Sequence, residues 1–478
     1  MAPQATLSSR EQSAVEATLA RHIAVLASDD FGGRQPGTDG ETKTLRYLAR
    51  EWQAAGLESG TNDPANPWFA PVELSLSLPE KSSVRFYRNG RPIPLAAGSA
   101  AVFTTGTRGL VQRAPVLFVG EQGEQLEGIE VAGRVALMLW DHPGHVEQRD
   151  ALLRAGASAV LAIVSDEGEL SKITGTRRRG TYRIAGGDDG AAIDGVLTRA
   201  ALMTLVGQDR LDQLLRAASE SDFRPVPLDL NASLEATSAP GSVRTHNLIA
   251  RLPGRRPSAG AVLVLAHWDH FGRCATPPAD DLTCNGAVDN ASGLAVQTEL
   301  ARRLAAGPKL ERDVYFLATT AEEWGLLGSR AFTENPSIPL ESIVAAFNLD
   351  TLAVAPAGSA VSIVGKGLTP LEPGIARVIA EAGRREGDER LAQDYVRRQD
   401  SWALLQRDVP AVSVTSAFAR PELFERFVAE HYHQPSDEAA GVELGGAAED
   451  LMLNEALVRY FADPQRWPGK RGKSGAAP

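Results

Sequence analysis

Cysteine is scarce in this 478-residue chain, which contains only Cys274 and Cys284. Two cysteines are too few for a disulfide-stapled scaffold, and their spacing is not that of a CxxC redox or zinc motif. The chain also lacks any run of about 18 apolar residues, so we expect no transmembrane helix.

An excess of basic residues is missing as well. The 60 Asp and Glu residues outnumber the 49 Lys and Arg residues, and the formal net charge is −11. This charge argues against nucleic acid or an anionic membrane as a partner, but it identifies no substrate. The first residues, MAPQATLSSREQS, have neither the basic nor the apolar segment of a secretory leader. Two explanations stay open: the protein is cytoplasmic, or a leader has been removed and a start Met added.

What the chain does contain is an alternation of apolar strands with amphipathic helices. Helical periodicity is present over residues 14–27 and about 41–55. The strongest strand-like runs are AVLVLAH (261–267), VYFLATT (314–320), IVAAFNLD (343–350) and PAVSVTS (410–416). Continuous apolar strands separated by helices predict an α/β fold with a doubly wound, mostly parallel central sheet covered on both faces.

The segment between the two α/β parts of the chain has a different pattern of predicted secondary structure. Short β-like runs dominate from about 76 to 238, with one helical stretch near 147–155. We therefore expect a β-rich domain over 76–238, inserted into a domain formed by 10–75 and 239–466. The tail, residues 467–478, has low complexity and is expected to be disordered.

Acidic and histidine side chains follow the expected strands where the strands end. They are His267, Asp269, Asp289, Glu322, Glu323, Asp350, His431 and His433. Each has an ordinary explanation when taken alone, such as a helix cap or a solvated turn. Because the carboxyl ends of the strands in an open α/β sheet lie at one rim, where ligands bind, we expect these side chains to meet there. Imidazole and carboxylate groups suit zinc, so the rim is a predicted zinc site.

The adjacent pair Glu322 and Glu323 can divide two tasks. Neighbouring side chains on an extended segment point to opposite sides. Zinc needs a carboxylate that stays bound, whereas hydrolysis needs a second carboxylate free to accept a proton from water. The pair is therefore predicted to supply one ligand and one general base.

The motifs around these residues resemble a known family. AHWDH, NGAVDNASG, TTAEEWGLLGS, FNLD and YHQPSD are similar to the five motif blocks of the co-catalytic di-zinc aminopeptidases, a family that also includes glutamate carboxypeptidase II and plasma glutamate carboxypeptidase. The N-terminal stretch LASDDFGGRQPGTDG resembles the family's opening block. The inserted segment resembles a protease-associated domain, chiefly through RVALMLW (134–140) and AVLAIV (159–164).

The resemblance implies a role for each candidate residue. His267 would be a ligand of one zinc and His433 of the other, with Asp289 bridging both. Glu323 would bind one zinc and Asp350 its partner. Beside these five ligands, three residues would assist catalysis: Glu322 as general base, Asp269 by orienting His267, and Tyr432 by stabilising an oxyanion. His270 and His431 match no ligand position and are expected to be structural.

The function implied is a zinc-dependent exopeptidase, most simply an aminopeptidase acting on peptides through a hydroxide that bridges two zinc ions, in the periplasm or outside the cell. A carboxypeptidase or dipeptidase on the same fold is an alternative, because the metal ligands are shared. A one-zinc glutaminyl cyclase is another. An alternative of a different class is a receptor-like binding protein without catalysis. The motifs carry no information on oligomeric state.

Cys274 and Cys284 lie between the expected ligands His267 and Asp289. Zinc ligation, two free thiols and a disulfide are the three interpretations. We expect the disulfide, which would persist only in an oxidising compartment and would favour an exported protein.

Overall fold

The computed structural model describes residues 8–121, 131–141, 144–186, 192–220, 222–275, 277 and 279–469. The chain divides into two compact units. Unit 1 consists of Met1–Glu73 and Val243–Pro478, and unit 2 of Leu74–Ser242. The expected insertion over 76–238 falls inside unit 2, while residues 470–478 of the expected tail lie outside the described residues.

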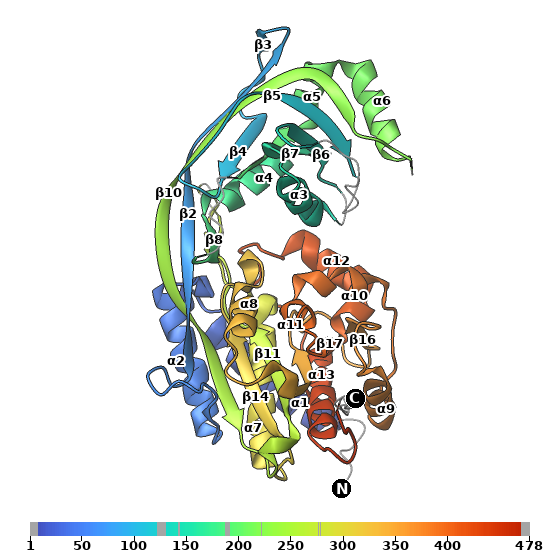
Figure 1. Ribbon diagram of the computed structural model, residues 1–478. Coiled ribbons are helices and arrows are strands. Elements are labelled where there is room, and N and C mark those ends of the chain that lie inside the picture. The colour runs from blue at the N-terminus through green and yellow to red at the C-terminus, as the bar shows by residue number, and fades with distance from the viewer. Residues whose placement is uncertain are drawn as a thin grey trace, which may run out of the picture. The chain divides into compact units, whose positions relative to one another are not determined.

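Unit 1 is built on a sheet whose inner strands are parallel (Figure 1). Its strands, in spatial order, are β16 (Ser362–Val364), β17 (Ala411–Thr415), β15 (Ile343–Asn348), β11 (Ala261–His267), β14 (Asp313–Thr319) and the end of β10 (Val226–Leu252). The strands β17, β15, β11 and β14 are parallel, whereas β16 and β10 pair antiparallel at the two sides. The predicted α/β class with a doubly wound, mostly parallel sheet is confirmed.

Both faces of this sheet are buried, and β11 shows why. Val262, Val264 and Ala266 belong to one core cluster, whereas Leu263 and Leu265 belong to another. The first cluster also contains side chains of α1 (Ser9–Leu26), α2 (Asp39–Ala54), α7 (Ser292–Ala306), α9 (Glu372–Glu381) and α13 (Gly445–Phe461). The second contains side chains of α8 (Leu327–Glu334) and α11 (Ser401–Leu405). A strand that is apolar at every position can bury both sets only between two helical layers.

Unit 1 also contains several smaller elements. They are the 3-10 helix Asp29–Arg34, the short strands β1 (Glu58–Ser59), β12 (Gly272–Arg273) and β13 (Thr283–Cys284), and the helices α10 (Arg390–Asp394) and α12 (Pro421–Glu430). The strands β12 and β13 form a small hairpin that the disulfide Cys274–Cys284 closes. The expected disulfide is thus present.

Two chain ends in unit 1 differ from the sequence prediction. Helix α1 begins at Ser9 rather than near residue 14, because Ser8 and Glu11 form a capping box that satisfies the first backbone N–H groups. Trp467, expected in a disordered tail, packs its ring 4.9 Å from that of Phe461, and its carbonyl accepts a hydrogen bond from Arg312. The ring contact and the hydrogen bond to the carbonyl together hold Trp467 in place against unit 1.

Unit 2 contains more helix than the sequence indicated. Its central strands β5 (Arg108–Gly120), β6 (Val135–Leu139), β7 (Ala159–Val164) and β9 (Ile193–Thr198) are parallel, and β4 (Ala100–Thr104) pairs antiparallel with β9. Its helices are α3 (His145–Arg154), α4 (Glu167–Arg178), α5 (Arg199–Val206) and α6 (Gln208–Ala218). The remaining strands are β2 (Phe69–Arg88), which like β10 contains residues of both units, β3 (Arg91–Ile93) and β8 (Thr181–Ile184). Only the first helix was predicted, and the identity of unit 2 as a protease-associated domain stays a prediction.

Among the described residues, no helix is both long enough and apolar enough to cross a membrane.

Candidate metal centre

The six predicted ligand and base residues lie at the carboxyl ends of the parallel strands of unit 1. They come from the last residue of β11 (His267), the turn before α7 (Asp289), the turn after β14 (Glu322 and Glu323), the segment after β15 (Asp350) and the segment after α12 (His433). The rim that the sequence predicted therefore exists, and these side chains converge on it.

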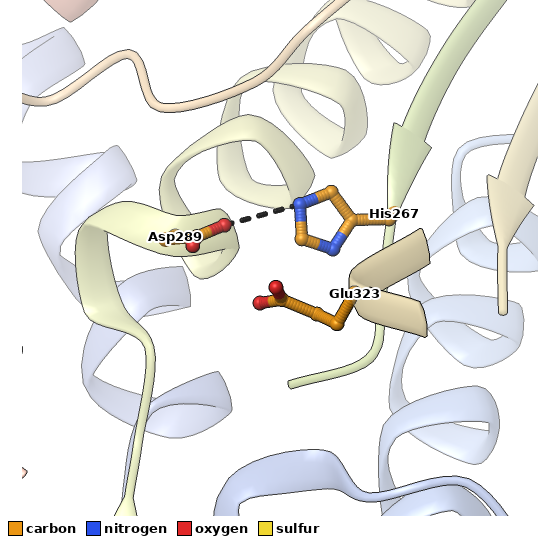
Figure 2. Close-up of side chains that lie close together, drawn as sticks. All are labelled: His267, Asp289 and Glu323. Carbon is orange, nitrogen blue, oxygen red and sulfur yellow. Dashed lines mark ion pairs between the residues drawn. The ribbon is translucent and has the colours of Figure 1, made fainter. Parts of the chain in front are cut away.

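Asp289 lies between two imidazoles. Its Oδ1 atom is 3.1 Å from Nε2 of His267, and its Oδ2 atom is 3.3 Å from Nε2 of His433. Figure 2 shows His267, Asp289 and Glu323 pointing toward one another. One carboxylate that faces a different imidazole with each oxygen has the arrangement of a bridging ligand.

Each imidazole has a second carboxylate beside it. Nε2 of His433 is 3.0 Å from Oε2 of Glu323, and Nε2 of His267 is 3.5 Å from Oδ1 of Asp350. The site thus has two halves that share Asp289. Ligand atoms of His267, Glu322 and Asp350 also lie within 4.8 Å of one another, so Glu322 borders the half that contains Asp350.

Two buried atoms at the centre have no hydrogen-bond partner within the described part of the chain. They are Oδ2 of Asp289 and Nε2 of His433, which face each other. Leaving such polar atoms unsatisfied is costly, and a cation held between them would satisfy both. Nitrogen and carboxylate oxygen ligands in this arrangement fit zinc.

The backbone beside the site is in left-handed conformations that residues other than glycine rarely adopt. The φ angles are 52° at Arg34, 50° at Ala321, 55° at Thr351 and 60° at His433. Each such residue costs about 1–3 kcal/mol and persists where the surroundings hold it. Three of these four residues are a ligand or directly precede or follow a predicted ligand or base, so part of the backbone strain lies at the metal centre.

Comparison with known proteins agrees with this geometry. Residues 247–454 match the family model described as Peptidase family M28. This segment belongs to peptidase family M28. The matched range contains all five predicted ligands together with Glu322.

Curated relatives match parts of the M28 segment. The Alkaline phosphatase isozyme conversion protein of Escherichia coli is 34% identical over 118 residues, which are 24% of this chain and 33% of that protein. The Probable lipoprotein aminopeptidase LpqL of Mycobacterium tuberculosis is 33% identical over 122 residues, 25% of this chain and 22% of that protein. The chain thus matches a third or less of the length of these relatives.

A solved structure extends the likeness to both units. The aminopeptidase from Aneurinibacillus sp. strain AM-1 superposes with a TM-score of 0.60 over 94% of this chain and 93% of its own, at 18% identity. At this identity the likeness concerns the fold alone, and it includes the α/β layers of unit 2.

The two adjacent glutamates of the M28 segment have opposite electrostatic surroundings. Burial raises the pKa of Glu322 well above its usual range; His267 opposes this effect, and neighbouring carboxylates, including Asp350, add to it. Burial also acts to raise the pKa of Glu323, but His433 and His270 outweigh it, and the pKa is lowered. Environments that push two pKa values apart are typical of residues with separate roles.

The histidines and the shared aspartate form a charged pair on each side. Burial alone would lower the pKa of His433, but the carboxylates of Glu323 and Asp289 raise it to about 9. The pKa of His267 is likewise raised well above its usual value against the effect of burial, chiefly by Glu322 and Asp289. Burial would raise the pKa of Asp289, yet the two neighbouring imidazoles, of His267 and His433, hold it well below the usual range. A cation at this position would replace the protons on the imidazoles.

Asp269 has partners other than those predicted. Its carboxylate Oδ1 lies 3.9 Å from Nδ1 of His267, whereas the carbonyl oxygen of Asp269 lies 3.1 Å from that nitrogen. The carboxylate instead accepts hydrogen bonds from the backbone N–H groups of Glu322 and Glu323, at 3.1 and 3.4 Å. Asp269 therefore orients His267 through its main chain and fixes the glutamate turn through its side chain.

His270, expected to be structural, contacts a predicted ligand directly. Its Nδ1 atom is hydrogen bonded to Oε1 of Glu323, and the ring is completely buried. This contact leaves Oε2 of Glu323 facing His433. The place of His270 directly after the His-x-Asp motif does not predict this contact.

Tyr432 and His431 flank the metal centre without joining the cluster. The ring of Tyr432 stacks on that of His433 with the centroids 3.6 Å apart, and burial raises the pKa of its hydroxyl well above the usual value. A neutral hydroxyl suits the oxyanion role, which stays a prediction. His431 lies 3.0 Å from the hydroxyl of Ser436 through Nδ1, and its structural role stays a prediction.

Sequence reasoning missed the residues that hold the Asp289 turn. The carboxylate of Asp437 accepts hydrogen bonds from the backbone N–H groups of Val288 and Asp289, at 2.9 and 3.1 Å. The side chain of Asn290 donates to the carbonyl of Leu349 at 2.9 Å and accepts from the N–H of Thr351 at 3.3 Å. These bonds tie the turn that carries Asp289 to the segment that carries Asp350.

Proposed function

We propose that this chain is a zinc-dependent exopeptidase, most simply an aminopeptidase that removes N-terminal residues from peptides. The observation that carries the proposal is the position of Asp289, with one oxygen toward His267 and the other toward His433. The shared fold of the Aneurinibacillus aminopeptidase and the name of the mycobacterial relative support the aminopeptidase assignment.

Five residues would hold two zinc ions. His267 and Asp350 belong to one site and His433 and Glu323 to the other, with Asp289 common to both. When bound, zinc polarises the peptide carbonyl and lowers the pKa of water. Three carboxylates offset most of the charge of two divalent cations, which makes burial of the cluster tolerable.

Glu322 is the proposed general base. Its carboxylate lies within 4.8 Å of ligand atoms of His267 and Asp350, and its pKa is raised by burial. It would take the proton of the attacking water and deliver it to the departing amine. The hydrogen bonds from the N–H groups of Glu322 and Glu323 to Asp269 hold the turn from which the side chain projects.

Two alternatives to an aminopeptidase are a related peptidase activity and a binding function without catalysis. A carboxypeptidase or dipeptidase would keep every residue named above, and only substrate polarity would distinguish it. A receptor-like binding protein would not need the complete set. The presence of five facing ligands and a separate buried glutamate favours catalysis.

A cleavage panel tests the proposal. One peptide is offered with free ends, N-acetylated, or C-amidated, and products are identified by mass spectrometry, with Glu322→Gln as the control for contaminating peptidases. We expect N-acetylation to abolish cleavage and C-amidation to be tolerated, because an aminopeptidase needs the free amine. The reverse pattern would assign a carboxypeptidase, and cleavage of none of the peptides would contradict the proposal.

We also propose that the protein works in the periplasm or outside the cell. The disulfide Cys274–Cys284 supports this, since such bonds persist in oxidising compartments. Alkylation of protein isolated from its native compartment, followed by intact mass with and without reductant, is the test. Two thiols that react without reductant would remove the main argument for export.

A further inference from the structure

We propose that Arg34 is a positioning residue that fixes the His267 segment and the Asp289 segment of the metal centre relative to each other. The inference rests on the zinc ligands proposed above. It gives a function to the buried arginine of the loop between α1 and α2.

The guanidinium of Arg34 is fully buried and is hydrogen bonded to four main-chain carbonyls. Nε donates to Trp268 at 2.8 Å, Nη1 to Leu26 at 2.9 Å and to Asn285 at 2.5 Å, and Nη2 to Gly286 at 2.9 Å. None of these partners is a side chain, so the guanidinium holds the backbone of these segments in place.

The bonded carbonyls belong to the two ligand-bearing segments. Trp268 directly follows the ligand His267, and Asn285 and Gly286 begin the turn that carries Asp289. The guanidinium is a rigid planar fork, so donors to both segments set the spacing between them. Asp437 holds the same turn from its other end through the N–H groups of Val288 and Asp289.

The charge of Arg34 also suits this place. Burial lowers its pKa to about 10, and the carboxylates of Asp437, Asp289, Asp269 and Glu323 act against that effect. The hydrogen-bond partners of Arg34 within the described residues are neutral carbonyls, and the negative charges that offset its positive charge are these four carboxylates. Its positive charge reduces the repulsion among the carboxylates that must converge there.

The disulfide hairpin packs against the same loop. A Cβ atom on Gly33 would lie 2.3 Å from the carbonyl oxygen of Cys284 and 2.7 Å from Cα of Gly272. Contact this close between backbones requires glycine. The hairpin therefore delivers Asn285, the residue after Cys284, directly to the Arg34 side chain.

The chain offers a matched control in Arg312. This arginine is also buried, and its side chain donates to the carbonyls of Ala259, Phe461 and Trp467, each at 2.7 Å. None of those carbonyls lies beside a predicted ligand. Arg312 thus has the same chemistry and burial, without a link to the metal centre.

The test compares Arg34→Lys with Arg312→Lys in the full-length protein. Lysine keeps the charge and removes the fork. Zinc affinity is measured by equilibrium dialysis against zinc buffers, and the unfolding midpoint is measured on chelator-treated samples. We expect both variants to lower the midpoint, but only Arg34→Lys to weaken zinc binding, by about 10–100-fold, as for other residues that orient metal ligands.

Equal zinc affinity of Arg34→Lys and the parent, or equal weakening in both variants, would overturn the inference. If Arg34→Lys does not fold, Arg34→Gln is compared with Arg312→Gln by the same criterion. A parent protein that takes up no zinc would contradict the proposed function instead, so the two failures are distinguishable.

Discussion

Glu322 and Glu323 are neighbours in the chain but differ in their surroundings. Burial and carboxylates raise the pKa of Glu322, whereas His433 and His270 lower that of Glu323. The sequence alone suggested a division of labour, because adjacent side chains point apart. It could not supply His270, since nothing in the motif spacing requires a histidine to contact a carboxylate ligand.

We expect Glu322→Gln to retain its zinc and its fold but to lose about 10²–10⁴-fold in kcat, the usual contribution of a general base. Glu323→Gln should instead weaken zinc binding, because it removes the carboxylate charge beside His433. Steady-state kinetics and elemental analysis of both variants measure this. Equal zinc loss in the two variants would show that the pair does not divide its tasks.

The raised pKa of His433 couples stability to pH in zinc-free protein. Its pKa rises from the ordinary 6.5 to about 9 on folding, so the folded state retains a proton that the unfolded chain releases between these values. The stabilisation is complete below about pH 6.5 and is lost as the pH rises through about 9. His267, whose pKa is also raised, acts in the same direction.

Chelator-treated protein should therefore unfold at a lower temperature at pH 9 than at pH 6.5, as measured by calorimetry. His433→Ala should reduce the difference. A midpoint that rises over this interval would contradict the protonation scheme of the site.

At the scale of elements, the strands and their rim could be predicted, and the supports of the rim could not. An apolar run such as AVLVLAH predicts both a strand and the residue at which the strand ends. Arg34 has no such signal, because its partner Asn285 lies 251 residues away and contributes only a carbonyl. The helices missed in unit 2 did have local signals, since Asp166 and Thr198 are the N-caps of α4 and α5.

The contact between the Asp29–Arg34 helix and the disulfide hairpin predicts unequal effects at two adjacent glycines. Gly32 and Gly33 both have positive φ, 54° and 64°, but a Cβ on Gly32 would meet nothing within 4 Å. Gly33→Ala should therefore lower the free energy of unfolding by about 1–3 kcal/mol more than Gly32→Ala, through overpacking. Urea denaturation of both variants measures the difference. Equal losses of unfolding free energy would show that the hairpin does not restrict the space at Gly33.

At the scale of the whole molecule, the sequence pattern predicts domain boundaries near residues 76 and 238. Unit 2 of the structure runs from Leu74 to Ser242. Composition changes at such boundaries because each unit buries its own core, here separate clusters of apolar side chains. The convergence of five distant segments at the metal centre follows from the parallel sheet, whose strands end on one side. Which peptide end is recognised does not follow from the fold, because ligands and base are common to both polarities.

The central claim is that Asp289 joins two zinc sites, and the zinc content of the purified, zinc-equilibrated chain tests it most directly. We predict two zinc ions per chain by elemental analysis, about one in His433→Ala, and close to none in Asp289→Asn. His431→Ala, which changes a neighbouring histidine bonded to Ser436, should retain both. One zinc or none in the parent protein, or an unchanged content in Asp289→Asn, would contradict the account.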